Sequence, residues 1–273
     1  MKNNRRLSLF LVLVLVLAIA LAGCGKQAVN EKTLTIGATS KPHAEILNHI
    51  VPLLQDKVIE LNVIEFADYA QLNPALKNKE LDANFFQHSP YLNDYNSKEK
   101  ATLISAVAVH FEPLGLYPGK TKALDQIKDG DIIAVPNDTT NEARALLLLE
   151  SMGLIKIKEG AGFNATVRDI VENPKNLKIE ELDAAQLARA LPDVNLAVIN
   201  GNYAIQAGLN VAKDALIAED KDSVAAQSYA NIVVVRAGDE NREAVKILKE
   251  VITSEEVKKF INDKYEGSVI PVF

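Results

Sequence analysis

Short apolar stretches alternate with amphipathic stretches from residue 33 to the end of the chain, and this alternation restricts the possible folds most. The apolar stretches have the length of β-strands, and the stretches between them have the spacing of helices. The predicted strands are 34–37, 61–66, 83–86, 105–110, 132–136, 196–199 and 232–236, and the predicted helices are 43–54, 69–77, 142–152, 186–190 and 242–253. This order of elements predicts an α/β fold with mostly parallel sheets.

Two lobes are expected, because about 250 residues of strand and helix units exceed the commonest size of a single domain. The turn-rich stretch 112–119 predicts one crossing between the lobes, and the stretch 228–231 predicts a second. Lobe 1 would comprise 33–113 and 231–273, and lobe 2 would comprise 114–230. Capping boxes, in which Thr139 pairs with Glu142 and Thr253 with Glu256, predict the starts of two helices.

Residues 1–23 have the pattern of an export signal. Three basic residues, Lys2, Arg5 and Arg6, precede an apolar run over 9–22 that is shorter than the ~20 residues of a membrane-spanning helix. A retained transmembrane anchor is the alternative. The run leads into Leu-Ala-Gly-Cys at 21–24, which looks like a lipobox, where the cysteine is lipid-modified and becomes the first mature residue. We therefore expect a mature chain that begins at Cys24, with 24–32 as a polar tether.

Charge and cysteine content exclude several classes of protein. The chain has 30 Lys and Arg against 36 Asp and Glu, so loss of the three basic residues in 1–23 changes the net charge from −6 to −9. An acidic chain without a basic run argues against a nucleic-acid partner. The single cysteine can form neither an intrachain disulfide nor a multi-thiolate metal site. The lipid on Cys24 would therefore hold the protein at the membrane.

No catalytic or cofactor motif stands out in the sequence. The stretch 160–165 fits the G-x-G-x-x-A fingerprint, but alternating apolar and charged residues before it favour a loop over a nucleotide site. His43 and His49 are six residues apart and cannot bind zinc as an i,i+4 pair, which leaves a zinc site built from the four scattered histidines as the alternative. The motifs of serine hydrolases, zincins and P-loops are absent. We expect no enzyme activity, cofactor or metal.

Arg144 is the main candidate for binding an anion. It is one of only five arginines in the mature chain and lies three residues after Asn141, in the first turn of a helix that follows a predicted strand. In open α/β sheets ligands bind at this edge, and a guanidinium there suits a carboxylate bound bidentately. The alternative is an ion pair between Arg144 and a surface acid such as Glu142.

Aromatic and amide side chains gather at other predicted strand ends. The turn after strand 83–86 reads Phe-Gln-His-Ser-Pro-Tyr over 86–91, and turns seldom bury large rings unless something apolar is held there. Asn200, Asn202 and Asn231 flank two further strands. Each amide alone is more often a turn residue, but as a set facing Arg144 they could accept hydrogen bonds from an ammonium group.

Several long motifs together resemble the methionine-binding lipoproteins of the MetQ or NlpA type. They are the lipobox, FFQHSPYL at 85–92, HFEPLGLY at 110–117, AVPNDTTN at 134–141 with Arg144, and VINGNYA at 198–204. The likeness covers the whole mature chain. It implies a periplasmic-binding-protein-like fold, with two α/β lobes, two crossing segments and a ligand cleft between the lobes. It also implies the substrate-binding component of an ABC importer for methionine.

The resemblance further implies roles for particular residues. Arg144 would bind the ligand carboxylate. The amides that would bind the carboxylate or the ammonium group are Asn141, Asn202 and Asn231. The residues that would line the slot for the thioether are Tyr69, Phe86, His88 and Tyr91, with sulfur–aromatic contacts of roughly 0.3–1.5 kcal/mol each. The secondary candidates are Phe85, Phe111 and Asn200.

We therefore expect an extracytoplasmic lipoprotein, anchored to the cell membrane through Cys24, that binds methionine in the L form, with the D form also open. It would deliver the ligand to an ABC permease and its ATPase. One alternative is a receptor for a methionine-containing dipeptide or another apolar amino acid. A second alternative is a surface adhesin or signalling lipoprotein without a transport role.

Overall fold

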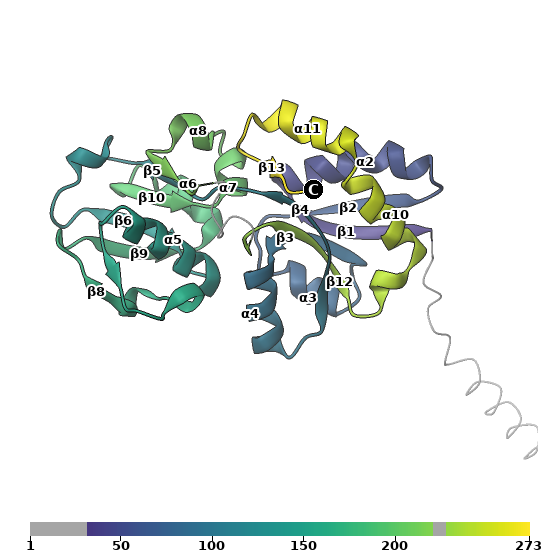
Figure 1. The fold of residues 1–273 in the computed structure, drawn as a ribbon, viewed down its shortest axis with the longest axis horizontal. Coiled ribbons are helices and arrows are strands. Elements are labelled where there is room, and N and C mark those ends of the chain that lie inside the picture. The colour runs from purple at the N-terminus through teal and green to yellow at the C-terminus, as the bar shows by residue number, and fades with distance from the viewer. Residues whose placement is uncertain (1–31, 221–227) are drawn as a thin grey trace, which may run out of the picture. The chain divides into compact units, whose positions relative to one another are not determined.

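The computed structural model describes residues 32–220 and 228–273, which fold into two mixed sheets covered by helices (Figure 1). The export signal, Cys24 and all of the expected tether except Lys32 lie outside the described residues. Within the described ranges, no helix is both long enough and apolar enough to cross a membrane. The strands and helices alternate along the chain, which confirms the predicted α/β fold.

The six-stranded sheet has the order β13-β4-β12-β3-β1-β2. Its strands are β1 (Thr33–Thr39), β2 (Glu60–Phe66), β3 (Ala83–His88), β4 (Leu103–Phe111), β12 (Asn231–Arg236) and β13 (Ile270–Pro271). Its helices are α2 (Glu45–Gln55), α3 (Leu72–Lys77), α4 (Ser89–Glu99), α10 (Glu243–Ile252) and α11 (Glu255–Tyr265), and a π-helical turn, η1 (Ser40–Ala44), precedes α2.

Side-chain alternation along the strands builds a core on each face of this sheet. Val233 and Val235 point to the face covered by α2, α10 and α11, whereas Ile232 and Val234 point to the face covered by α3 and α4. Strands that are buried on both faces need continuous apolar sequence. The run IVVV in β12 meets this requirement.

The five-stranded sheet has the order β11-β5-β10-β6-β9. Its strands are β5 (Gly115–Pro118), β6 (Ile132–Pro136), β9 (Lys178–Leu182), β10 (Leu196–Ile199) and β11 (Ile217–Ala218). Its helices are α5 (Thr139–Ser151), α6 (Leu187–Ala190), α7 (Gly201–Gln206) and α8 (Val211–Asp214). A short ribbon of β7 (Lys156–Ile157) and β8 (Ile170–Glu172) lies beyond α5 in the chain.

All seven predicted strands are present, but the expectation of mostly parallel sheets was wrong. β12 pairs antiparallel with both β3 and β4, and β5 pairs antiparallel with β10 and β11. The reason is that β12 begins beside the end of β3, where Asn231 pairs with His88, and so it runs in the opposite direction. Gly115–Pro118 was expected only as a turn-rich crossing, yet it forms strand β5.

Side-chain caps differ from the prediction at two helices, and a third helix begins later than predicted. Asp138 caps α5 by accepting from the Asn141 N–H, so the predicted box at Thr139 was wrong. Ser254 caps α11 in place of Thr253, whose hydroxyl donates to the Lys249 carbonyl. The helix predicted over 69–77 begins at Leu72 and leaves Tyr69 in a turn. The glycine-rich stretch 160–165 is a loop with a short 3₁₀ turn, as predicted.

The chain passes between the two sheets along two segments. The first joins β4 to β5 between Phe111 and Gly115, and the second joins β11 to β12 between Ala218 and Asn231. The strands of 33–111 and 231–271 thus belong to one sheet, and the β5–β6–β9–β10–β11 sheet lies between them in sequence. The stated lobe boundaries stay a prediction.

Candidate ligand-binding site

A small cavity of about 20 Å³ lies where the two sheets meet. It is lined by Tyr69, Phe86, Gln87, His88, Tyr91, Glu112, Asn141, Arg144, Asn200, Gly201, Asn202 and Asn231. The structure therefore brings all eight primary candidates, and Asn200, to one place. β3, β6 and β10 each direct their carboxyl end or the loop that follows it toward the cavity, which is the usual position of ligands in α/β folds.

The other two secondary candidates do not line the cavity. Phe85 lies in the core on the opposite face of β3, with its ring edge against the His43 and His110 rings. Phe111 is buried, and its ring centroid lies 5.6 Å from the Arg144 guanidinium carbon. Strand alternation explains this result, because adjacent residues of β3 must point to opposite faces.

Three aromatic rings form one wall of the cavity. The ring centroids of Tyr69 and Tyr91 each lie within 5.6 Å of the Phe86 centroid, and 5.9 Å from each other. Tilted and edge-on contacts at these separations are favourable, so the rings hold one another in place. This wall offers apolar and polarizable surface to a ligand.

His88 joins the aromatic wall to the polar side of the cavity. Its Nδ1 accepts from the Tyr91 backbone N–H, so the ring proton lies on Nε2, which donates to Asn141 Oδ1 over 3.1 Å. Burial, followed by the positive charge of Arg144, lowers the pKa of His88 to about 3. The imidazole is therefore neutral at physiological pH.

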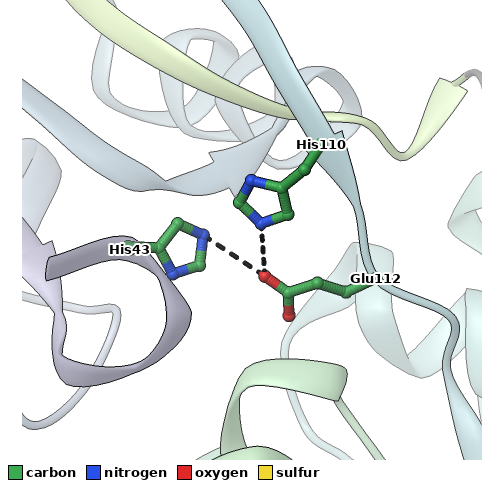
Figure 2. A group of neighbouring side chains, drawn as sticks. All are labelled: His43, His110 and Glu112. Atoms are coloured by element: carbon green, nitrogen blue, oxygen red, sulfur yellow. Dashed lines mark hydrogen bonds and ion pairs between the residues drawn. The ribbon is translucent and has the colours of Figure 1, made fainter. Parts of the chain in front are cut away.

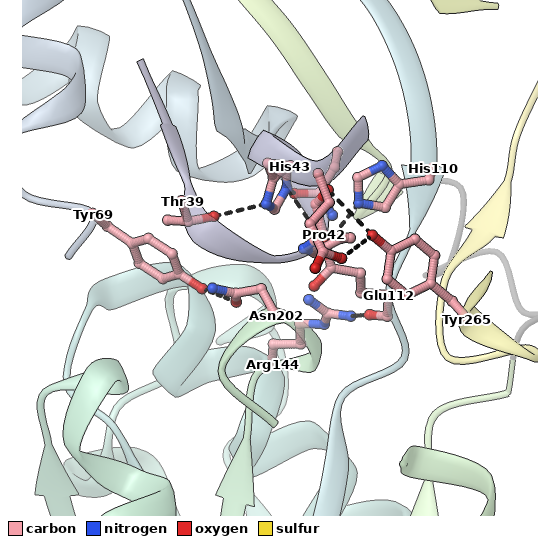
Figure 3. Close-up of polar contacts among 11 residues, drawn as sticks. Thr39, Pro42, His43, Tyr69, His110, Glu112, Arg144, Asn202 and Tyr265 are labelled. Carbon is pink, nitrogen blue, oxygen red and sulfur yellow. Dashed lines mark hydrogen bonds and ion pairs between the residues drawn. The ribbon is translucent and has the colours of Figure 1, made fainter. Parts of the chain in front are cut away.

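The amides around the cavity differ in how fully they are engaged. Asn141 accepts from both His88 and Asn200 and donates to Asp138, so all its polar atoms have protein partners. Asn202 accepts from the Tyr69 hydroxyl (Figure 3), but its Nδ2 is buried without a partner among the described residues. The Oδ1 of Asn200 is in the same situation. Because buried polar groups seldom lack a partner, these two atoms are open to a ligand.

Arg144 is already bound by a carboxylate of the protein. Glu219 accepts from its Nε over 2.7 Å and from its Nη2. The Glu112 carbonyl accepts from Nη2 over 2.9 Å (Figure 3). The guanidinium carbon also lies 4.3 Å from the Tyr229 ring centroid. The alternative partner Glu142 is not used, since its carboxylate accepts from the Val167 N–H. Within the described ranges, Nη1 is the part of the guanidinium left without a hydrogen bond.

Beside the cavity, Glu112 faces His110, two residues before it, and His43, which is distant in the sequence (Figure 2). Its Oε1 lies 2.7 Å from His110 Nε2 and 3.4 Å from His43 Nε2, and all three residues are buried. Burial lowers the pKa of His43 to about 4 and that of His110 to about 3, and it raises the pKa of Glu112. Both imidazoles are therefore neutral at physiological pH.

Gln87, Glu112 and Gly201 line the cavity but were missed in the sequence. Gln87 belongs to a buried amide cluster in which Asn73 donates to Gln87, and Gln87 donates to Asn73 and Asn84. A Cβ on Gly201 would lie 2.6 Å from Glu112 Cβ, so only glycine allows this approach. The signal available was the position of these residues inside the motifs at 85–92, 110–117 and 198–204.

Several known proteins are similar to this chain over most of its length. The methionine-binding lipoprotein MetQ of Bacillus subtilis (strain 168) is 41% identical over 92% of this chain and 93% of its own length. A nutrient binding protein from Burkholderia cenocepacia, solved bound to methionine, has a TM-score of 0.84 and 45% identity over 88% of this chain and all of that one. An ABC transporter periplasmic substrate-binding protein from Coxiella burnetii has a TM-score of 0.82 and 42% identity, again over 88% of this chain and all of that one.

These structures share the fold over nearly the whole described length. The family described as NlpA lipoprotein matches residues 34–273, which is far more than half of the chain. The chain therefore belongs to the NlpA lipoprotein family.

Proposed function

We propose that the protein is a lipid-anchored, extracytoplasmic receptor that binds methionine and delivers it to an ABC importer. The observation that carries this proposal is a buried cavity with an aromatic wall on one side and a guanidinium with unpartnered amide atoms on the other. A ligand that fits must be apolar at one end and zwitterionic at the other. The names of the relatives from Bacillus subtilis and Burkholderia cenocepacia identify methionine as such a ligand.

The thioether would lie against the rings of Tyr69, Phe86 and Tyr91, where sulfur–aromatic contacts contribute roughly 0.3–1.5 kcal/mol each. The ligand carboxylate would accept from Arg144 Nη1 and Asn202 Nδ2. Because Glu219 occupies Nε and Nη2, this carboxylate would bind Arg144 through Nη1 alone, and not through the bidentate contact expected from the sequence.

The ligand ammonium would donate to Asn200 Oδ1 and to the buried carboxylate of Glu112. Asn141 and His88 would act as positioning residues, because their polar atoms already bind protein groups. Asn231 Oδ1 lies 3.1 Å from His43 Nε2 and would hold that ring beside Glu112.

Three hydrogen bonds close the cavity between the two sheets. Tyr69 donates to Asn202, Tyr203 donates to the Ala67 carbonyl, and His88 donates to Asn141. A ligand enclosed in this way can reach the cavity only if these contacts open. We infer a hinge motion of the two predicted lobes about the crossing segments, with the permease selecting the closed form.

Calorimetry on the purified protein tests the ligand. L-methionine and D-methionine should be compared with leucine and glycyl-methionine, and absence of methionine binding would refute the proposal. Asn202→Leu removes the free Nδ2 at similar volume and should weaken methionine binding about tenfold, because an unmade buried hydrogen bond costs about 1–3 kcal/mol. Asn241→Leu, at an exposed position outside the cavity, is the matched control.

Cell fractionation tests the membrane anchor separately. Cys24→Ala should move the protein out of the membrane fraction without altering methionine affinity. A membrane-bound Cys24→Ala variant would contradict lipid attachment at Cys24. A strain that lacks the receptor should take up less methionine when the external supply is limiting.

A further inference from the structure

Four donor atoms from three separate regions of the sequence converge beside the ligand cavity. His43 Nε2, His110 Nε2 and Glu112 Oε1 all lie within 4.8 Å of one another, and Asn231 Oδ1 lies 3.1 Å from His43 Nε2. Both imidazole rings point at the same carboxylate (Figure 2). Ligands about 2.0–2.1 Å from a tetrahedral metal ion are about 3.3 Å apart. The 3.4 Å separation of Glu112 Oε1 from His43 Nε2 is therefore close to that of a metal site, and the 2.7 Å separation from His110 Nε2 is a hydrogen bond that a metal ion would replace.

A second layer of contacts orients the first histidine for this role. His43 Nδ1 lies 2.7 Å from Thr39 Oγ1, so this hydroxyl could accept the ring proton if a metal ion displaced it from Nε2 to Nδ1. His110 Nδ1 has no partner among the described residues, so no hydrogen bond there opposes a shift of the ring proton from Nε2 to Nδ1. In the structure both Nε2 atoms donate to oxygen acceptors, so a metal ion would take their place as the ring proton moves to Nδ1 or leaves.

The charges around Glu112 also favour a cation. The nearby guanidinium of Arg144 is already paired with Glu219. Among the described residues, no lysine or arginine forms an ion pair with the Glu112 carboxylate. A buried carboxylate is ordinarily paired with a cation or bound to a metal. Arg144, Glu219 and Glu112 together carry one negative charge in excess.

The cavity provides a path to the cluster, because Glu112 and Asn231 line it. The donor set of two imidazole nitrogens and one or two oxygens suits zinc and its neighbours cobalt and nickel. Magnesium and calcium prefer sites made of oxygen alone. We propose that His43, His110 and Glu112, with Asn231 beside them, bind one divalent transition-metal ion of the zinc type next to the ligand cavity.

This site makes a specific prediction about the ligand. A metal ion on Glu112 would compensate the same negative charge that the ligand ammonium would compensate under the proposed function. Ion and ligand should therefore oppose each other's binding. By linkage the loss of affinity must be equal in the two directions.

The test uses full-length protein without a polyhistidine tag, purified in detergent and stripped of metal with a chelator. Cobalt titration followed by visible absorption, and zinc binding by equilibrium dialysis, should give one ion per chain with the spectrum of a tetrahedral nitrogen and oxygen site. Glu112→Gln should weaken binding by about tenfold or more. His110→Gln, at a position that does not line the cavity, should do the same. His49→Ala removes a histidine outside the cluster and should leave binding unchanged.

Two results would overturn the proposal. One is a wild-type protein that binds no cobalt or zinc in stoichiometric amount. The other is binding that persists in Glu112→Gln and His110→Gln but is lost in His49→Ala. Should both cluster variants fail to fold, saturating methionine must still weaken cobalt binding to the wild type, and unchanged binding would refute the site. Methionine calorimetry on the metal-free sample checks the proposed function independently.

Discussion

The ion pair between Arg144 and Glu219 should contribute more to folding stability than any surface pair of this protein. The perturbation is Glu219→Gln, which removes the negative charge and keeps the shape of the side chain. Only 5% of the Arg144 side chain and 12% of the Glu219 side chain are exposed, and Glu219 accepts from two nitrogens of the guanidinium. The variant would leave a buried cation without its counter-charge.

The expected loss of stability follows from this geometry. Breaking a buried ion pair by removing one partner costs about 3–5 kcal/mol. The lower end applies here, because the Glu112 carbonyl and the Tyr229 ring still contact the guanidinium and glutamine keeps an acceptor oxygen. A loss of about 3 kcal/mol corresponds to a fall in Tm of about 6–12 °C for a folded unit of this size.

Urea denaturation of the ligand-free protein measures this loss. A double-mutant cycle with Glu219→Gln and Arg144→Met should show a coupling of about 2–3 kcal/mol, since the second substitution removes the charge that the first leaves unpaired. Glu172→Gln is the matched control, because the pair of Glu172 with Lys156 is about 60% exposed on both sides and should contribute less than about 1 kcal/mol.

Methionine should restore part of the lost stability, since its carboxylate can bind the donors that Glu219 releases. The midpoint of unfolding should therefore rise more with methionine in Glu219→Gln than in the wild type. A loss no larger than that of Glu172→Gln, or two substitutions whose effects simply add, would refute the claim that this pair is a buried, coupled unit.

Three further predictions concern the cavity and its support. The pKa of His88 is about 3 in the folded protein against about 6.5 in the unfolded chain, so the imidazole is neutral in the fold. Its contribution to the free energy of unfolding is complete above pH 6.5 and declines as the pH falls toward 3, by about 2 kcal/mol at pH 5. Denaturation of the wild type and of His88→Asn across this pH range would show the difference, and equal pH profiles would count against it. Gly201→Ala should lower stability by about 1–3 kcal/mol and weaken methionine binding, because the new Cβ would overlap Glu112. A variant that binds methionine in calorimetry as tightly as the wild type would contradict this. Asn73→Leu should cost about 1–3 kcal/mol in thermal unfolding, because the buried Gln87 Oε1 loses its donor, and an unchanged Tm would argue against the amide cluster.

Much of the fold could be predicted from the sequence, because its signals are local. Apolar runs such as 132–136 and 196–199 identify buried strands within a few residues, and all seven predicted strands formed. The direction of β12 could not be predicted from apolar runs, since it depends on which end of the six-stranded sheet the chain enters after the second crossing. Helix starts also moved, because a neighbouring Asp or Ser proved the better cap.

The candidate site shows the same division. Residues with distinctive chemistry next to strand ends, such as Arg144, Phe86 and Asn202, were found in the sequence because strand ends meet at one edge of a sheet. Glu112 was missed because it lies on a crossing segment with no local pattern of a ligand residue. The six-residue spacing of His43 and His49 argued against a zinc pair on one helix. That argument does not apply to His43 and His110, which lie on different elements.

The sequence by itself determined the α/β class, the strands and the family motifs, because apolar periodicity and short motifs act over a few neighbouring residues. Only the tertiary structure decided that Glu219, 75 positions after Arg144, neutralises the guanidinium expected to bind the ligand. It also decided that two distant histidines meet Glu112. The physical reason is that buried charges choose partners by distance in space after desolvation, and no local pattern encodes that distance.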